Sequence, residues 1–185
     1  FNYKVTKINI LKDEQFKTEF KKLSPFSKIP VIIDHDTNKS LFESGAILIY
    51  LGEKSGKFYD KGQRTNINQW LMGQMAYVGP MLGQHHQFHH YNPGKSEFGE
   101  KRYFKISERI YKELDERLLK SKFLAGEDYT IADIATFPWI ARHEWHDIGL
   151  KKFKGLKRWY EEISKREAVQ RGYDLLNKGE KIPKA

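Results

Sequence analysis

The sequence predicts an α/β unit over residues 1–58, followed by an all-α unit over residues 59–185. In the first stretch, short β-branched runs alternate with apolar residues at helical spacing, in the order β-α-β-β-α. In the second, apolar residues recur at three- and four-residue steps almost throughout. The two patterns indicate two domains of different class.

The first two elements of the α/β unit are predicted from alternation and spacing. Tyr3–Ile10 alternates apolar and polar side chains, which is typical of a strand. Gln15–Leu23 carries Phe16 and Phe20 at helical spacing and ends before a Ser-Pro pair. We expect a short helix there.

A β-hairpin and a second helix follow. Val31–Ile33 and Ser40–Phe42 are short runs suited to strands, separated by a polar turn. Ser44 precedes a helical apolar pattern that extends to about Lys54, and Gly56 is placed to cap the end of that helix.

The all-α unit contains three strong helical patterns. Asn66–His90 predicts a long helix or a kinked pair, with the break at Gly79 and Pro80, and Ser96–Lys120 predicts a helix with one buried face. Thr130 and Asp133 have the spacing of a capping box, which predicts the start of another helix.

The composition excludes several classes of protein. The longest apolar run, Ala46–Leu51, is far shorter than the ~20 residues of a membrane-spanning helix, and the residues after Phe1 alternate in polarity, unlike a signal peptide. We therefore expect a cytoplasmic protein without membrane association. Because these 185 residues contain no cysteine, thiol chemistry would have to use the sulfur of a ligand.

The formal charge of +9 is compatible with nucleic acid, an acidic surface or an anionic small molecule as a partner, or with solvated lysines alone. The 33 Lys and Arg residues are dispersed, with Glu or Asp close by in segments such as EFKK, KELDER and EEISKRE. This pattern is typical of solvated helix faces and not of a nucleic-acid interface. We expect no nucleic-acid partner.

The segment around residues 29–44 combines features that suit an α-amino acid head group. Pro30 opens its strand, and a cis X-Pro bond there would turn the backbone groups of Ile29 and Val31 outward. Ser44 begins a helix, where the first N–H groups and the helix dipole attract a carboxylate. Glu43 beside it can pair with an ammonium group. One corner thus offers both an anion site and an amine site.

Two groups of segments carry a resemblance to a known family. The Ile-Pro pair followed by FESGAILIYL resembles the glutathione site in the thioredoxin-like domain of cytosolic glutathione transferases. Four further segments resemble the all-helical C-terminal domain of the bacterial nu-class-like branch: LMGQMAYVGPMLGQHHQF, YNPGK, GEDYTIADIATFPWIAR and KRWYEEISKREAVQRGY. Members of that branch reduce disulfides with glutathione. The resemblance covers essentially the whole chain.

The resemblance implies roles for four residues of the corner. In the family, Glu43 and Ser44 hold the γ-glutamyl head group of glutathione. The backbone N–H and C=O of Ile29 pair with the cysteinyl part, as a short added strand would. Pro30 shapes that approach.

The resemblance implies roles for three further residues, and two of them have an alternative explanation. Lys28 meets the glycine carboxylate of glutathione, unless it is only a surface lysine. Gln15 matches a family position that touches glutathione. Arg102 matches an arginine that reaches a glutathione carboxylate in the disulfide-reducing branch, unless it is an exposed helical arginine.

The chain departs from the family at its beginning. The family's thioredoxin-like domain starts with a strand and a helix that have no counterpart here, and in the resembling branch that unit holds a Thr and an Asn near the reactive sulfur. The catalytic residues are therefore unassigned and are expected in a segment absent from this sequence. Either the sequence is part of a longer protein or the domain is truncated.

A histidine-rich segment raises the question of a metal site. His85, His86, His89 and His90 include pairs four residues apart, which can chelate a metal on a helix. No cysteine or spaced acidic cluster completes a ligand set, and the family places this segment near its cleft. We expect no metal.

The resemblance implies a homodimeric enzyme that reduces disulfides with glutathione. Two glutathione molecules would supply both sulfurs, which is compatible with the absence of cysteine. The partners would be glutathione and a small disulfide or electrophile. The alternative is a non-catalytic module of the same fold, with a binding or regulatory role.

Overall fold

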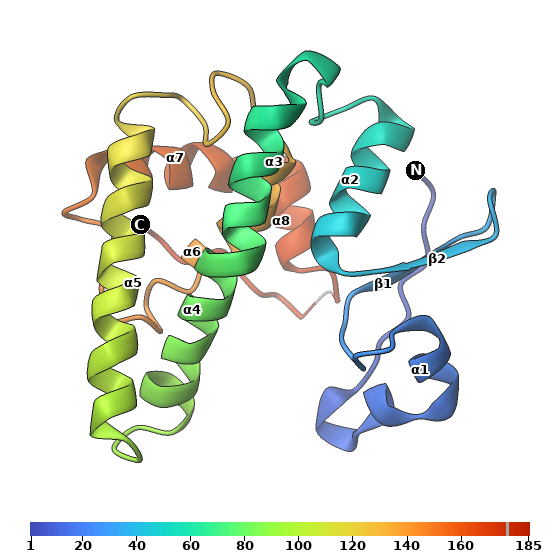
Figure 1. Ribbon diagram of the computed structural model, residues 1–185, viewed down its shortest axis with the longest axis horizontal. Coiled ribbons are helices and arrows are strands. Elements are labelled where there is room, and N and C mark those ends of the chain that lie inside the picture. The colour runs from blue at the N-terminus through green and yellow to red at the C-terminus, as the bar shows by residue number, and fades with distance from the viewer. Residues whose placement is uncertain (177) are drawn as a thin grey trace. The chain divides into compact units, whose positions relative to one another are not determined.

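The computed structural model describes residues 1–176 and 178–185. The chain separates into two compact units, Phe1–Ser55 and Gly56–Ala185, and each is described by itself. The first combines strands and helices and the second is helical, as the sequence predicts (Figure 1). The domain boundary at 58/59 stays a prediction.

The first unit is built around a two-stranded sheet. Its elements are 3₁₀ turns Ile10–Lys12 and Glu14–Phe16, helix α1 Thr18–Leu23, strands β1 Val31–Asp34 and β2 Lys39–Phe42, and helix α2 Ser44–Ser55. β1 and β2 are antiparallel, with Val31 opposite Phe42 and Asp34 opposite Lys39. The predicted hairpin and the helix that follows it are confirmed, and Gly56 ends α2 with a φ of +66°.

The predicted strand over Tyr3–Ile10 is wrong. Residues 1–9 form no strand, and the sheet of the described residues contains β1 and β2 alone. Polarity alternates along a strand because one face is buried, whereas the side chains of residues 1–7 are all exposed. Without a neighbouring strand and a buried face, the alternation does not produce a strand.

The predicted helix over Gln15–Leu23 is shorter than expected. Lys17 has an extended backbone, with φ −63° and ψ 143°, and separates the 3₁₀ turn Glu14–Phe16 from α1. Phe20 is the buried residue of α1, while Phe16 is exposed. Gln15 therefore lies in a turn ahead of the helix.

The second unit consists of helices and the segments that connect them. After the 3₁₀ turn Lys61–Gln63 it contains α3 Arg64–Gly73, α4 Gly79–His85, α5 Glu97–Leu118, α6 Ile131–Ile140, α7 Lys154–Ser164 and α8 Glu167–Tyr173. π-helical turns, Gln74–Val78 and His86–Tyr91, lie on either side of α4.

The chain passes Gly79 and Pro80 without leaving the helical conformation. Pro80 sits in the first turn of α4 and lacks an N–H, so one carbonyl of the preceding helical turn has no intrahelical donor from it. The irregularity that the sequence predicts at this pair is instead the widened turn Gln74–Val78 just before it. A Cβ on Gly79 would come within 3.1 Å of the Trp139 ring, so glycine permits this close approach.

The core of the second unit is centred on the start of α6. The capping box of Thr130 and Asp133 is confirmed. Asp133 is fully buried and its carboxylate also accepts from the Leu124 N–H and from the Trp159 indole N–H, at 3.0 Å and 2.8 Å. These bonds connect α6 to α7 and to the chain that enters α6.

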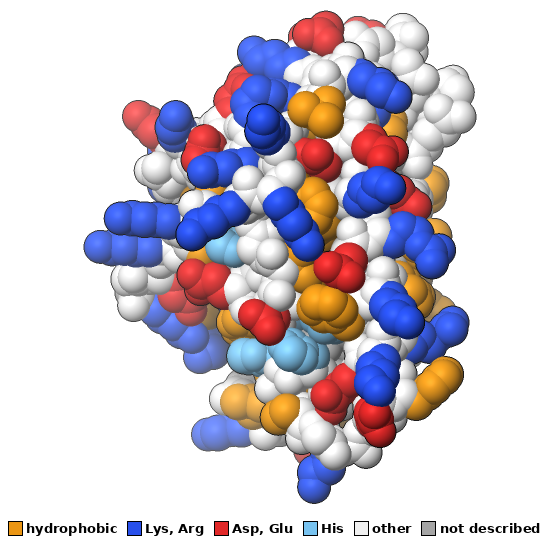
Figure 2. Space-filling view, turned by 90° about the vertical axis from the view of Figure 1, so that its left-hand side faces the viewer, with side chains coloured by type: hydrophobic (Ala, Val, Ile, Leu, Met, Phe, Trp, Pro, Cys, Tyr) orange, Lys and Arg blue, Asp and Glu red, His pale blue; other side chains and the backbone are white. Residues whose placement is uncertain are grey.

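Charged side chains of both signs alternate on the face of the molecule at the left of Figure 1, where α5 lies (Figure 2). Lys101 pairs with Glu97 at 2.5 Å, Lys152 with Glu108 at 3.3 Å. Such pairing is typical of a solvated face. None of the described helices is long and apolar enough to span a bilayer.

Candidate functional site

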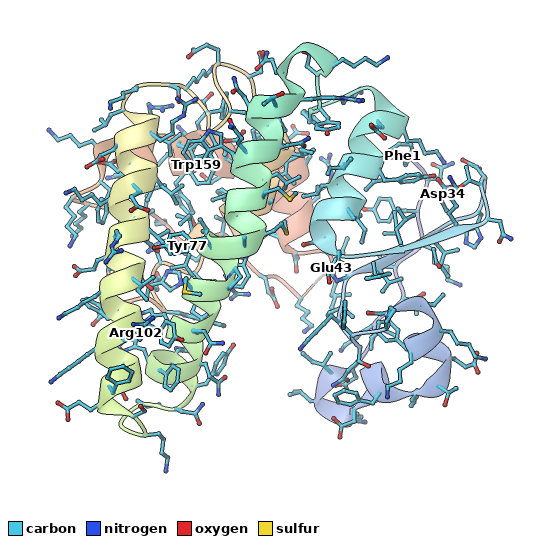
Figure 3. All side chains as sticks on the ribbon, in the orientation of Figure 1. Phe1, Asp34, Glu43, Tyr77, Arg102 and Trp159 are labelled. Atoms are coloured by element: carbon cyan, nitrogen blue, oxygen red, sulfur yellow. The ribbon has the colours of Figure 1, made fainter. Side chains whose placement is uncertain are left out.

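Glu43 is the only residue between β2 and α2. Its φ of 67° lies in the left-handed region, which residues other than glycine rarely adopt. Its carbonyl accepts from the Ile47 N–H across 2.9 Å, which starts the hydrogen-bond ladder of α2. The chain thus turns from strand to helix within one residue, with Glu43 exposed at the turn (Figure 3). Backbone conformations of this kind concentrate at functional sites.

Ser44 is the first residue of α2 and is half-buried. A helix of this length presents the positive end of its dipole and its first N–H groups at the N-terminus, which favours an anion there. The first turn of α2 contains no acidic residue that would oppose an anion. The carboxylate of Glu43 and the anion-attracting end of α2 are therefore adjacent.

Asp34 on β1 connects the hairpin to α2 through its side chain. Its Oδ2 accepts from the Lys54 ammonium and from the Tyr50 hydroxyl, each at 2.5 Å. These two hydrogen bonds lower the pKa of Asp34 to about 2. The carboxylate is therefore ionised near neutral pH and holds β1 against the C-terminal half of α2.

The loop before β1 carries three of the predicted residues. The Ile29-Pro30 peptide bond is cis. Lys28, Ile29 and Pro30 are all exposed, and Ile29 keeps 52% of its surface despite being apolar. This loop is therefore open to an approaching molecule.

Gln15 lies in the 3₁₀ turn ahead of α1. Its Nε2 donates to the Ile10 carbonyl at 3.3 Å, which directs the amide oxygen away from that carbonyl. The oxygen is buried and has no hydrogen-bond partner among the described residues. A buried acceptor without a partner is costly, and a ligand N–H would satisfy it.

Arg102 belongs to the second unit, whereas the other six predicted residues belong to the first. It lies on α5, exposed, with its guanidinium carbon 5.9 Å from the centroid of the Tyr103 ring (Figure 3). The six residues of the first unit come from three places: the turn before α1, the loop before β1 and the junction of β2 with α2. Their roles in binding stay predictions.

The sequence analysis missed a hydrogen-bonded cluster in the second unit. His86 and His146 are buried, and the Tyr111 hydroxyl lies 2.6 Å from Nδ1 of His146. His85, fully buried, has its Nε2 2.9 Å from the His146 carbonyl and therefore donates to it. His146 lies 60 residues from His86, so no local pattern could have revealed the contact.

The histidines of residues 85–90 are engaged in ring contacts. His85 stacks on His89 and His90 stacks on Trp145, with centroids 4.9 Å and 4.2 Å apart. Within residues 1–176 and 178–185, no group of three or more His, Cys, Asp or Glu is arranged to hold a metal ion.

The comparisons with known families match both units. The N-terminal domain model of glutathione S-transferases matches residues 1–53, and the C-terminal domain model matches residues 77–167.

Two relatives from Escherichia coli are named as oxidoreductases. The chain is 41% identical to the disulfide-bond oxidoreductase YfcG over 175 residues, which are 91% of this chain and 81% of YfcG. It is 38% identical to the disulfide-bond oxidoreductase YghU over 181 residues, which are 89% of this chain but only 61% of YghU.

Two solved structures have the same fold. A glutathione transferase from Burkholderia graminis, with two glutathione molecules bound per subunit, has a TM-score of 0.86 and 36% identity and covers 92% of this chain and 77% of its own. A glutathione transferase from Pseudomonas putida, with one glutathione disulfide bound per subunit, has a TM-score of 0.86 and 38% sequence identity. The match covers 92% of this chain and 80% of the Pseudomonas putida chain.

The family matches agree with the geometry of the first unit and with the helical second unit. Residues 1–55 form a thioredoxin-like domain, and the remainder is the all-α domain that accompanies it. The chain belongs to the glutathione S-transferase family.

Proposed function

We propose that this protein binds glutathione at the junction of β2 with α2 and uses it to reduce small disulfides. The observation that carries the proposal is the left-handed Glu43 at the start of α2. Its carboxylate suits the ammonium of the γ-glutamyl group, and the helix start with Ser44 suits the carboxylate of the same group. An α-amino acid has both charges on one carbon, which matches two adjacent sites.

The remaining predicted residues extend the site along the peptide. In this proposal the backbone of Ile29, next to Pro30, pairs with the cysteinyl residue, and Lys28 meets the glycine carboxylate. The unpartnered amide oxygen of Gln15 suits a peptide N–H of the ligand. Arg102 on α5 is a candidate for a glutathione carboxylate, because a guanidinium can bind one with two hydrogen bonds.

The reaction that fits is thiol–disulfide exchange between ligands. A glutathione thiolate attacks one sulfur of the disulfide, which forms a mixed disulfide and releases one thiolate. A second glutathione thiolate attacks the glutathione sulfur of the mixed disulfide, which gives glutathione disulfide and the second product thiol. Two glutathiones are oxidised and one disulfide is reduced. The sequence contains no cysteine, so both attacking sulfurs come from glutathione.

The relatives support this reaction. YfcG and YghU are named disulfide-bond oxidoreductases, and the structure from Pseudomonas putida contains glutathione disulfide, the oxidised product. The structure from Burkholderia graminis contains two glutathione molecules in each subunit, the number that the exchange consumes.

Calorimetry with glutathione and glutathione disulfide tests the binding site. We expect Glu43→Ala and Ser44→Ala each to weaken glutathione binding by about tenfold or more, because each removes a contact with a charged group. Glu19→Ala is the matched control, since Glu19 is an exposed glutamate on α1 of the same unit. Equal affinity in Glu43→Ala and wild type would refute the proposed site.

Turnover separates the enzyme from a non-catalytic module. Reduction of bis(2-hydroxyethyl) disulfide by glutathione is measured on the same samples, with glutathione disulfide formation as the readout. Turnover that falls in Glu43→Ala supports the enzyme. Binding without turnover favours the alternative, a binding or regulatory module of this fold.

We also propose a homodimer that works in the cytoplasm. The support is the resemblance to the glutathione transferase family, whose members form homodimers. Sedimentation at several protein concentrations tests the assembly, and a monomer throughout would refute it. Cell fractionation tests the location.

A further inference from the structure

Ser24 occupies a buried position between α1 and the loop that precedes β1. Only 1% of its surface is exposed. Its N–H donates to the Phe20 carbonyl at 2.9 Å, as the last hydrogen bond of α1, and its carbonyl accepts from the Ser27 N–H at 2.9 Å. The backbone of Ser24 is therefore held by the helix before it and by the turn after it.

The hydroxyl of Ser24 bonds both backbone groups of one residue. Oγ donates to the Lys28 carbonyl at 2.8 Å and accepts from the Lys28 N–H at 3.0 Å. A hydroxyl has one donor and two acceptor positions, so this geometry uses its donor and one acceptor. The two groups of a residue in an antiparallel sheet are bonded in the same way by the residue opposite.

The two hydrogen bonds between the Ser24 hydroxyl and the Lys28 backbone determine which backbone groups of the loop remain for a ligand. Both groups of Lys28 point inward to Ser24, and Pro30 has no N–H to offer. Ile29 lies between them and is half exposed. The N–H and C=O of Ile29 are therefore the pair that can meet the backbone of a peptide ligand.

We propose that Ser24 is a positioning residue for glutathione, which holds Lys28 so that Ile29 presents its N–H and C=O to the cysteinyl residue of the ligand. The inference rests on the proposed function, because it needs glutathione as the peptide. Ser24 itself does not touch the ligand and acts through Lys28.

The competing explanation is that Ser24 only stabilises the unit. Two ligands separate the explanations. Glutathione reaches Ile29 through its cysteinyl residue, whereas γ-glutamylethylamide keeps the head group that Glu43 and Ser44 bind and lacks the cysteinyl residue. A loss of stability would affect both ligands, but a misplaced Ile29 affects glutathione alone.

The experiment measures the dissociation constants of both ligands on the full chain. We expect Ser24→Ala to weaken glutathione about tenfold and to change γ-glutamylethylamide by about twofold or less. Ser24→Thr keeps the hydroxyl and should retain most of the glutathione affinity. Ser27→Ala is the matched control, because Ser27 contributes its backbone N–H, which the substitution leaves in place.

Amide hydrogen exchange on the wild type gives a second test that needs no variant. We expect the Lys28 N–H to be protected with or without glutathione, and the Ile29 N–H to become protected when glutathione is added. This measurement decides the question if Ser24→Ala does not fold.

The outcomes distinguish this inference from the proposed function. If wild type binds glutathione and Glu43→Ala does not, but Ser24→Ala binds as wild type does, the role of Ser24 is refuted and the glutathione site stands. Equal losses for both ligands in Ser24→Ala, or an Ile29 amide that glutathione does not protect, also refute it. If wild type binds no glutathione, both proposals fail.

Discussion

The Nε2 atoms of His86 and His146 lie 2.7 Å apart in the buried interior of the helical unit. One of them must carry the hydrogen and the other must accept it, so this bond needs at least one neutral ring. Burial, together with the neighbouring histidines, lowers the pKa of His146 to about 2 and that of His86 to about 4. The pair is therefore neutral in the folded protein.

This neutrality predicts that stability falls with acidification. An unfolded histidine takes up a proton near pH 6.5, whereas the folded pair does not, so the unfolded state binds more protons below that pH. The free energy of unfolding should be largest above pH 6.5 and decrease as the pH falls toward 4. Urea unfolding between pH 8 and pH 4.5 measures this slope.

Matched variants show which histidine is responsible. His86→Gln removes one of the four histidines whose pKa is lowered and should flatten the slope by up to about one proton. His35→Gln, at an exposed position in the hairpin turn, should leave the slope as in wild type. A wild-type slope in His86→Gln would contradict the assignment.

The Tyr111 hydroxyl is expected to matter for stability because it is buried and hydrogen-bonded. Tyr111 is fully buried, and its hydroxyl is 2.6 Å from Nδ1 of His146. Tyr111→Phe leaves that nitrogen without its partner and should lower the free energy of unfolding by about 1–3 kcal/mol. Chemical denaturation at pH 8 measures the loss. Tyr91→Phe, at a position 59% exposed, is the control and should change stability by less than about 0.5 kcal/mol.

Asp133 should be among the most sensitive positions of the helical unit. Its carboxylate accepts from the N–H groups of Leu124 and Thr130 and from the indole of Trp159, all buried. Asp133→Ala leaves these donors unpaired and removes the helix cap, so we expect a loss of about 3 kcal/mol or more. Thermal unfolding is the measurement, with the exposed Asp128→Ala as control. Comparable melting temperatures for the two variants would disprove the role of Asp133.

We expect opposite effects on stability when Gly155 and Gly73 are each replaced by alanine. A Cβ on Gly155 would lie 2.7 Å from the Leu119 nitrogen and 2.9 Å from the Asp115 carbonyl, so α7 and α5 would have to separate. Gly73 has open space at the same position, at the end of α3. We expect Gly155→Ala to destabilise by about 2 kcal/mol or more and Gly73→Ala to be neutral or to stabilise by up to about 1 kcal/mol. Urea midpoints of the two variants check both, and a stable Gly155→Ala would contradict the close packing.

Elements that depend on neighbours in the sequence were predicted well. The hairpin, the start of α2 at Ser44 and the capping box of Thr130 follow from residues within about one turn or one strand pair. The strand predicted over Tyr3–Ile10 is not formed. A strand needs a neighbouring strand to pair with, and the alternation of residues 3–10 gives no information about such a neighbour. The sequence predicts no metal site at residues 85–90, but it does not predict the ring contacts that these histidines make.

The sequence by itself determined the hairpin, the start of α2, the capping box of Thr130 and the class of each unit, because periodicity, caps and turns are local properties. The tertiary structure decided three other things. It gave Glu43 its left-handed backbone, it placed the Ser24 hydroxyl on Lys28, and it brought His146 to His86 across 60 residues. Side-chain contacts of this kind depend on how the chain packs, and packing follows from all residues together.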